Sequence, residues 1–330
     1  MIATDRHRRA AGESRSGMYE LIEIPADAAE APEQMGTKRK FWFHHPELGL
    51  CLFKLARPET GEDWSEKVAC ELARLLGIPH ARYEMATWSG QPGSLSVSML
   101  GELDTLIHGN ELIAQLTSDY PAPDVAPRFG NSGHTLPLVL ETIERSGAEP
   151  PIPADLPNGV DTAVDVFVGF LLLDALIGNT DRHHENWGVI ERLDLTEEDI
   201  WLHLHLAPTY DHALCLGRNE PDARRAERLR SRDRGNTVEA YADRCDSALY
   251  MNAADRKPLR TIDAFRHASE LRARAAGCVE GAVARRRSSR DRGCAGRGPA
   301  AALLVRCARV RNAYRSTQPC PFARNRGLAP

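Results

Sequence analysis

The feature of this chain that most constrains its fold is a change of sequence pattern near residue 105. Before it, short stretches alternate apolar and polar residues, as in MYELIEI (18–24), RKFWFHH (39–45) and SLSVSML (94–100), which is typical of half-buried strands. After it, ELIAQL, LPLVLETI and DTAVDVFVGFLLLDALIG have helical spacing and are separated by Pro-rich loops at 120–128 and 150–158. The sequence therefore predicts an α+β fold of two lobes, the first small and β-rich, the second mostly helical.

The lobe boundaries follow from the same patterns. We place the β-rich lobe at residues 18–103 and the helical lobe at 104–270, after an N-terminal extension, residues 1–17, that we predict to be disordered. One helix is expected in the first lobe, in GEDWSEKVACELARLLGI (61–78). Its apolar residues recur at helical spacing, Asp63 and Glu66 are spaced as a capping box, and Gly77 is a C-terminal stop signal.

Residues 271–330 differ from the rest in charge and composition. They hold 14 Arg, one Asp and one Glu, a net charge of +12; the whole chain carries −4, which leaves −16 for residues 1–270. Four of the eight cysteines also lie there. We predict a tail that is disordered or the product of a shifted reading frame. A basic arm for nucleic acid is the functional alternative, and we expect no nucleic-acid binding outside this tail.

Composition otherwise indicates a soluble globular protein, with 42% hydrophobic and 27% charged residues. The longest apolar stretch, residues 164–178, is too short to cross a bilayer and contains Asp165 and Asp174, which are costly in lipid. Residues 1–17 lack the apolar segment of a secretory signal. No C-x-x-C pair occurs among the cysteines, which favours free thiols. We therefore predict a cytoplasmic protein that does not span a membrane.

A polar cluster follows the apolar stretch directly, in LIGNTDRHHENWGVI (176–190). Phosphoryl transfer from ATP needs an acid facing the acceptor hydroxyl and oxygen ligands for Mg²⁺, and protein kinases space these as Asp, four residues, Asn. Asp181 and Asn186 have this spacing. Asp211, after the strand pattern of 200–206, suits a second magnesium ligand. Upstream, Lys54 in a predicted strand and Glu66 in the predicted helix suit a phosphate-binding lysine and its carboxylate partner.

GNTDRHHEN (178–186) followed by APTYDHA (207–213) resembles the HipA-like kinases, and D-R-H-x-x-N is also similar to the catalytic loop of phosphoinositide kinases. The resemblance covers about residues 18–265, and the stretch from Gly61 to Ala81 is similar to the first helix of the family. It implies a two-lobed protein-kinase-like fold and a phosphotransferase that depends on ATP and Mg²⁺. The family is best known for bacterial serine/threonine protein kinases that act as toxins.

The resemblance also implies roles for the residues of the polar cluster. Asp181 would be the catalytic acid/base and His183 would lie near the transferring phosphate. Asn186 and Asp211 would bind magnesium. The acceptor would be a hydroxyl of a protein or of a small molecule, and an antitoxin-like regulator is a conceivable partner.

For the nucleotide, the resemblance implies that Lys54 binds the ATP phosphates and that Glu66 is its partner. Helix geometry alone leaves Glu71, nearer the apolar face, as an alternative to Glu66, which could instead cap its helix. There is no G-x-G-x-x-G loop, so the stretch MGTKRK (35–40) remains to hold phosphates. Its candidates are Gly36, Thr37 and Lys38.

Two other functions stay open. A pseudokinase would bind ATP, or a partner, without turnover. A metal-dependent hydrolase could draw its ligands from a His/Asp cluster within 181–212, namely His183, His184, His203, His205, Asp211 and His212. No pair there has the H-E-x-x-H spacing, and this function leaves Lys54 unexplained. We expect His184 and Glu185 to be solvated loop residues, and His203 and His205 to line the polar face of a strand.

Overall fold

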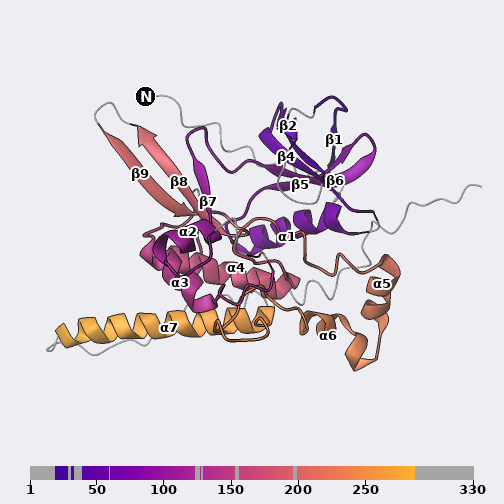
Figure 1. The fold of residues 1–330 in the computed structure, drawn as a ribbon. Coiled ribbons are helices and arrows are strands. Elements are labelled where there is room, and N and C mark those ends of the chain that lie inside the picture. Colours follow the sequence, from indigo (N-terminus) through magenta and orange to yellow (C-terminus); the bar gives the residue numbers. More distant parts are fainter. Residues whose placement is uncertain are drawn as a thin grey trace, which may run out of the picture.

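The computed structural model of the chain describes residues 19–28, 31–32, 39–58, 60–122, 127, 129–152, 156–195 and 199–286. Its elements form two lobes: a six-stranded sheet with one helix, and a helical body that carries a three-stranded sheet. Figure 1 shows helix α1 between the sheet of the first lobe and the helices of the second. Within the described ranges, no helix has the length and apolar character needed to cross a membrane. The predicted two-lobed α+β fold is confirmed.

The sheet of the first lobe has the strand order β1-β5-β6-β4-β3-β2. Strands β1 and β5 pair in parallel, and the other neighbours are antiparallel. Alternation along β3 and β4 buries Phe41, Phe43 and Phe53 against Leu95, which makes the core of this lobe. The strands are β1 (Leu21–Ile24), β2 (Ala31–Pro32), β3 (Lys40–His45), β4 (Gly49–Leu55), β5 (Tyr83–Trp88) and β6 (Gln91–Val97).

Helix α1 (Glu62–Leu76) joins the two lobes. It packs against β5 and β6, while its buried residues Ala69, Ala73 and Leu76 belong to the core of the helical lobe. Gly77 ends it in the left-handed conformation, at φ 69°, as predicted. The predicted capping box is wrong, because Gly61 is the N-cap and provides no side-chain cap.

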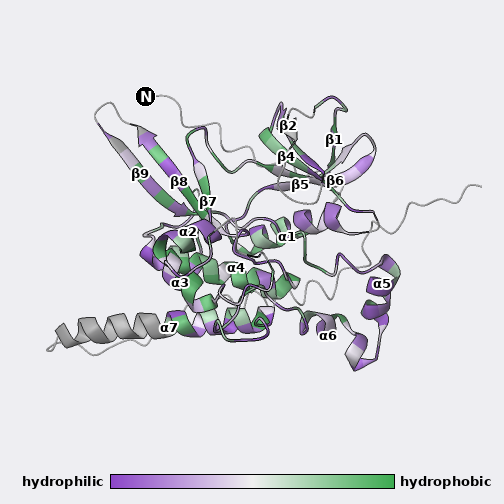
Figure 2. Cartoon of the chain, viewed as in Figure 1, coloured by the Kyte–Doolittle hydropathy of each residue, from purple (hydrophilic) through white to green (hydrophobic). Residues whose placement is uncertain are grey.

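The helical lobe is built around α4 (Ala163–Ile177), which is apolar on all sides and buried as such helices are. A capping box begins it: Thr162 Oγ1 accepts from the backbone N–H of Asp165, and the Asp165 carboxylate accepts from that of Thr162. Gly178, at φ 61°, ends it. Around it pack α3 (Leu136–Arg145), α7 (Thr261–Arg286) and, through α3, α2 (Gly109–Leu116). Figure 2 shows how apolar α4 is.

A second sheet, of order β7-β8-β9, stands on the helical lobe. It consists of β7 (Thr105–His108), β8 (Gly188–Leu195) and β9 (Ile200–Leu206), all antiparallel. The alternation of residues 200–206 predicted β9, whereas β7 and β8 were not predicted. His205 is buried and its Nδ1 lies 3.1 Å from the carbonyl oxygen of Pro150, so it does not line a polar face as expected.

The segment after β9 contains α5 (Asp222–Arg230), a short 3₁₀ turn η1 (Arg234–Asn236) and α6 (Val238–Ala242) before α7. Helix α7 crosses residue 270, where the predicted tail begins, and continues to Arg286. Residues 271–286 are rich in Ala and Arg, which are strong helix formers. Beyond Arg286, the predicted tail lies outside the described residues, as does the predicted extension of residues 1–17.

Candidate active site

The lysine of β4 and the acid after β9 meet where the two lobes face each other. Lys54 Nζ lies 3.2 Å from Asp211 Oδ2, and their side chains are 16% and 34% exposed. The two residues are 157 positions apart in the chain, so only the packing of the lobes brings them together. A cation from the first lobe and a carboxylate from the second therefore lie in contact.

Asp211 is held by an unusual backbone conformation. Its φ is 55°, in the left-handed region that only a few non-glycine residues adopt, Asp and Asn most readily. Its backbone N–H donates to Tyr83 Oη of β5 at 3.0 Å. Burial raises the pKa of the Tyr83 phenol, and the charge of Glu66 raises it further, so the phenol stays neutral. Tyr83, from the first lobe, thus helps to hold the backbone of Asp211, which belongs to the second lobe.

Glu66 faces the same site from α1. It is fully buried, and its Oε2 accepts from the backbone N–H of His212 at 2.8 Å. Glu71, the alternative, contacts Lys67 Nζ and Arg74 Nε instead, each at 2.9 Å. Glu66, and not Glu71, is therefore the carboxylate of α1 whose charge acts on Lys54. Glu66 does not cap α1, because the helix begins at Glu62 and Glu66 lies past its first turn.

The pKa of Lys54 reflects its surroundings. Burial favours the neutral amine and lowers the pKa, but the charges of Asp211 and Glu66, with Tyr83 beside them, outweigh burial and raise the pKa above its ordinary value. Lys54 is therefore an ammonium at any physiological pH. It can hold an anion such as a phosphate group.

The loop between α4 and β8, residues 178–187, carries the remaining predicted residues. Asp181, His183 and Asn186 are all buried. Asn186 Nδ2 donates to the carbonyl oxygen of Asp181 at 2.7 Å. The backbone N–H of Asn186 donates to the carbonyl oxygen of His183 at 2.9 Å. These two bonds close the loop on itself, so Asp181 and Asn186 are fixed relative to each other.

His183 is oriented toward Asp181. Its Nδ1 accepts from the backbone N–H of Glu185 at 3.2 Å, so the proton of the neutral ring lies on Nε2. That Nε2 lies 3.6 Å from Asp181 Oδ1. The loop therefore presents an N–H donor and a carboxylate side by side.

Arg182 connects this loop to helix α4. The sequence patterns did not predict this role. Arg182 is fully buried, and its Nε and Nη2 each donate to the carboxylate of Asp174 on α4 at 2.8 Å. Its Nη1 donates to the carbonyl oxygen of Asn186 at 2.7 Å, and its Nη2 donates to Thr209 Oγ1 at 2.9 Å. The sequence contains a hint, because Asp174 is an acid within an apolar helix and a buried acid requires a partner.

The loop is also bonded to the segment that leads into Asp211. Tyr210 Oη donates to the carbonyl oxygen of Glu185 at 2.9 Å, and His108 Nδ1 lies 2.8 Å from the same oxygen. With the bond from Arg182 to Thr209, the two residues before Asp211 are both tied to the loop. Asp181, Asn186 and Asp211 thus belong to one hydrogen-bonded unit.

His184 is buried, which contradicts the prediction of a solvated residue. Its Nδ1 lies 2.7 Å from Tyr120 Oη, and its ring packs against that of His134. His134 accepts from Trp187 Nε1 at 3.1 Å through Nε2, while its Nδ1 lies 3.1 Å from the carbonyl oxygen of Ala248. Burial lowers the pKa of His134 to about 3. The loop is therefore anchored in the core by two buried histidines, of which His134 stays neutral. Their burial depends on contacts between distant parts of the chain, which the sequence of the loop does not indicate.

The histidines proposed as metal ligands have other protein partners. His184 Nδ1 contacts Tyr120, His205 Nδ1 contacts Pro150, and His212 Nε2 lies 2.8 Å from Thr209 Oγ1. Among the described residues, no three His, Cys, Asp or Glu side chains are grouped as a metal site. The oxygen donors of Asp211 and Asn186 are the pair that suits a hard cation such as Mg²⁺. The phosphate-binding candidates Gly36, Thr37 and Lys38 lie outside the described residues.

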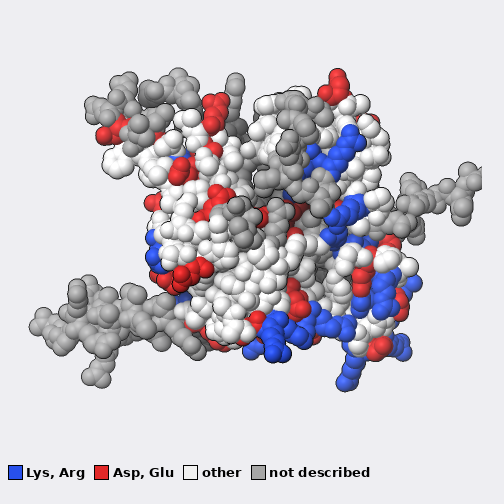
Figure 3. All heavy atoms as spheres, in the orientation of Figure 1, with Lys and Arg blue, Asp and Glu red and all other residues white. Residues whose placement is uncertain are grey.

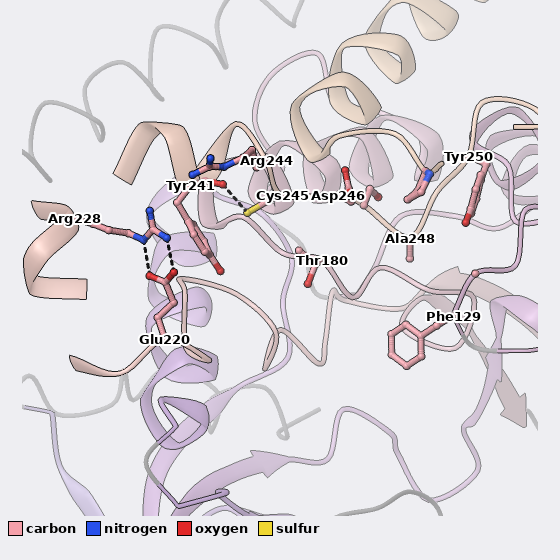
Figure 4. Close-up of a pocket in the computed structure, with 13 residues that line it drawn as sticks. Phe129, Thr180, Glu220, Arg228, Tyr241, Arg244, Cys245, Asp246, Ala248 and Tyr250 are labelled. Carbon is pink, nitrogen blue, oxygen red and sulfur yellow. Dashed lines mark hydrogen bonds and ion pairs between the residues drawn. The ribbon is translucent and has the colours of Figure 1, made fainter. Parts of the chain in front are cut away.

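A cavity of about 550 Å³ adjoins the loop on the side of the helical lobe (Figure 4). Thr180, the residue before Asp181, lines it, and Phe129 lines it while its ring stands edge-on to that of His183 at 5.4 Å. The other lining residues are Gly130 and members of the segment 220–258. The cavity therefore lies beside the loop of residues 178–187 and is formed by the helical lobe.

The sequence matches no protein family and no curated protein. Among solved structures, it is similar to the proinflammatory kinase CtkA of Helicobacter pylori, with 18% identity over 69% of this chain and 70% of that chain and a TM-score of 0.50. It is also similar to a chain in the complex of the toxin–antitoxin system HipA and HipB of Shewanella oneidensis MR-1 with its operator DNA, with 13% identity over 87% of this chain and 67% of that chain and a TM-score of 0.40. At this identity, the likeness to CtkA shows the fold: the chain has the two-lobed fold of a kinase.

Proposed function

We propose that the chain is a phosphotransferase that depends on ATP and Mg²⁺, a HipA-like serine/threonine kinase that transfers the γ-phosphate to a hydroxyl. The contact of 3.2 Å between Lys54 Nζ and Asp211 Oδ2 carries the proposal. It joins, from opposite lobes, the two residues that the sequence pattern had selected for the ATP phosphates and for magnesium. An ordinary strand lysine on the surface would not lie only 16% exposed with the charges of two carboxylates acting on it.

The donor atoms fit magnesium. Asp211 keeps 34% of its side chain exposed, so the carboxylate that contacts Lys54 is also open to the site. Asn186 uses its amide nitrogen to bond Asp181, which leaves its side-chain oxygen as the donor. Both are hard oxygen ligands of the type that Mg²⁺ prefers, and bound magnesium would neutralise charge on the phosphate oxygens.

The other residues have roles that the chain itself provides. Lys54 holds phosphate oxygens with its ammonium, which stays charged because Asp211 and Glu66 stabilise it. Asp181 accepts the proton of the acceptor hydroxyl as the hydroxyl attacks phosphorus. His183 Nε2, beside Asp181, donates to an oxygen of the phosphoryl group in transfer.

The proposal extends to parts of the function for which the sequence resemblance is the support. The acceptor is a serine or threonine of a protein, with a small-molecule hydroxyl as the alternative. Gly36, Thr37 and Lys38 would hold phosphate groups of the nucleotide. An antitoxin-like regulator and a cytoplasmic location complete the prediction.

Binding and transfer can be measured separately. Thermal unfolding with ATP and Mg²⁺ measures binding, because a ligand of the folded state raises the melting temperature. Incubation with γ-labelled ATP and Mg²⁺, followed by mass spectrometry of the protein and of a cell lysate, measures transfer. We expect stabilisation by ATP with Mg²⁺ and labelled serine or threonine residues.

Asp211→Asn tests the metal role directly. It removes one charge without changing shape, so we expect loss of the Mg²⁺-dependent part of ATP stabilisation and at least a hundredfold loss of transfer. Asp194→Asn, on an exposed position of β8, is the matched control and should change neither. Unchanged ATP affinity of Asp211→Asn in the presence of Mg²⁺ would refute the assignment, and ATP binding without transfer in the unmodified protein would identify a pseudokinase.

A further inference from the structure

We propose that the cavity beside the catalytic loop binds the acceptor, and that the acceptor is a serine or threonine in an acidic stretch of polypeptide. The inference rests on the proposed function and adds the class of substrate. The cavity borders Thr180 and Phe129, which adjoin Asp181 along the chain and His183 through ring contact. A hydroxyl bound beside Thr180 would therefore lie close to the loop that carries the proposed base.

The position of the cavity excludes the nucleotide as its main occupant. All of its lining residues belong to the helical lobe, whereas Lys54, proposed to bind the ATP phosphates, and its partner Glu66 come from the first lobe. Two substrates of a transfer reaction must approach the same phosphorus from different sides. The cavity therefore suits the second substrate.

The shape favours an extended chain over a compact small molecule. Figure 4 shows the lining residues spread in a row, with Arg228 and Tyr241 at one end, Thr180 in the middle, and Phe129 with Tyr250 at the other. Aromatic side chains at both ends provide flat apolar surface for neighbouring side chains of a peptide. A serine near the middle of such a peptide would face Thr180, the residue that precedes the proposed base.

The charge of the lining favours an acidic occupant. Glu220 is neutralised by Arg228, with two hydrogen bonds of 2.6 Å, and Asp246 pairs with Arg260 at 3.1 Å. Arg244 donates to the carbonyl oxygen of Gly235 at 2.9 Å and has no carboxylate partner among the side chains that the structure describes. The charge left in the cavity is therefore that of the Arg244 guanidinium, a group that binds carboxylates well.

The surroundings strengthen this charge. Residues 218–260 hold eleven Lys and Arg against eight Asp and Glu, although residues 1–270 together carry −16. Exposed Lys257 precedes Pro258 of the lining, and exposed Arg234 precedes Gly235, which Arg244 contacts. Figure 3 shows Lys and Arg gathered over the region of α5 and α6. A basic surface of this kind raises the encounter rate with acidic partners.

Binding can be tested without catalysis. Fluorescence anisotropy would compare labelled peptides that hold one serine in an alanine background, flanked by glutamates or by lysines. We expect the glutamate peptide to bind at least tenfold more tightly, and its affinity to fall as salt rises because exposed charges are screened. Equal affinities, or tighter binding of an oligothymidylate or oligouridylate of equal charge, would overturn the inference.

Charge reversal locates the binding. Arg244→Glu should weaken the glutamate peptide about fivefold to tenfold and strengthen the lysine peptide. Arg266→Glu, at an exposed position of α7 away from the cavity, is the matched control and should have no effect. An equal effect of both variants would overturn the inference, because the binding would then reflect net charge alone.

Phosphotransfer adds a measurement that separates the two proposals. In Arg244→Glu, kcat/KM for the glutamate peptide should fall by the same factor as binding, while the affinity for ATP stays unchanged. If the unmodified protein transfers no phosphate to any acceptor, the proposed function fails while the binding result still decides the occupant of the cavity. If transfer occurs with no preference for acidic peptides, the inference fails and the proposed function stands.

Discussion

At the scale of single residues, the site depends on a few side chains whose charge states follow from their neighbours. Lys54 stays charged because carboxylates surround it, and His134 stays neutral because burial prevents its protonation. Tyr83 stays a neutral phenol because burial and the charge of Glu66 both disfavour the phenolate. Each state leads to a role: the ammonium binds an anion, the imidazole accepts from Trp187, and the phenol accepts from Asp211.

Asp181→Asn should reduce transfer far more than it affects folding. Removal of a positioned base costs about 10²–10⁴-fold in rate, and we expect a loss in that range with ATP affinity unchanged within a few fold. Glu185→Gln is the matched control, because it neutralises a carboxylate in the same loop and keeps the backbone oxygen that Tyr210 contacts. The measurement is the rate of label transfer together with the melting temperature. Near-normal transfer by a folded Asp181→Asn protein would contradict the proposed role.

His134 should make the protein sensitive to mild acid. Its pKa is about 3 in the folded protein, against an ordinary value of 6.5, so below pH 6.5 the unfolded chain takes up a proton that the folded protein does not. The free energy of unfolding therefore falls with pH, by about 1.4 kcal/mol per pH unit for each such group. His134→Gln, whose side-chain oxygen can still accept from Trp187, should lose this share of the slope between pH 6 and pH 4. Urea unfolding of both proteins measures it, and equal slopes would show that His134 is not responsible.

At the scale of elements, the sequence indicated those whose pattern is local. Strand β3 and helix α1 bury residues at regular intervals, strand β9 alternates apolar and polar residues in its sequence, and helix α4 is one long apolar run, so each is visible in the chain. Strand β7 and its partner β8 were not predicted. Strand β7 has four residues, too few to establish alternation, and it is defined by its pairing with β8, which in turn pairs with β9.

The arrangement of the site was predictable only in outline. The spacing of Asp181 and Asn186 lies within one loop and can be read from the chain. The contacts that orient the loop are long-range: Trp187 with His134 across 53 residues and Tyr210 with His108 across 102. No periodicity encodes such pairs, because they depend on how the elements pack.

The predicted capping box of α1 also shows that spacing in the sequence does not determine a contact in the structure. Asp63 and Glu66 have the required spacing, yet α1 begins one residue before Asp63, and tertiary contacts occupy Glu66. Thr162 and Asp165 form a capping box at the start of α4. Spacing permits a cap, and the position at which the helix starts decides it.

At the scale of the whole molecule, α7 closes the helical lobe against the start of α4. Arg272 Nε donates to Asp165 Oδ1 at 2.6 Å, and Leu271 packs on the core. Burial raises the pKa of Asp165, but the hydrogen bond from Arg272 outweighs burial and the net pKa lies below its ordinary value. The pair therefore supports folding above the ordinary pKa of an aspartate, and this support is lost as the pH falls through the lowered value. Residues just past position 270 thus contribute to the folded lobe.

Arg272→Ala should lower the stability of the folded protein. The side chains of Arg272 and Asp165 are partly exposed, 31% and 15%, so we expect a loss of about 1 kcal/mol at neutral pH. For a protein of this size, that corresponds to roughly 2–4 °C in melting temperature. The control is Arg266→Ala, one turn and a half earlier on the same helix and far more exposed. Equal melting temperatures of the two variants would show that the contact to α4 contributes nothing.

The buried pair of Arg182 and Asp174 has a consequence for how the molecule opens. Backbone amides exchange with solvent only when their hydrogen bonds break, and amides fastened to the core exchange at the rate of global unfolding. The loop of residues 178–187 is bonded to α4, the most buried helix, so its amides should be among the slowest to take up deuterium. Helix α5 buries no residue and should exchange by local opening. The molecule would then hold the proposed catalytic residues on its most persistent part, while the surface around the proposed acceptor cavity opens and closes many times per unfolding event.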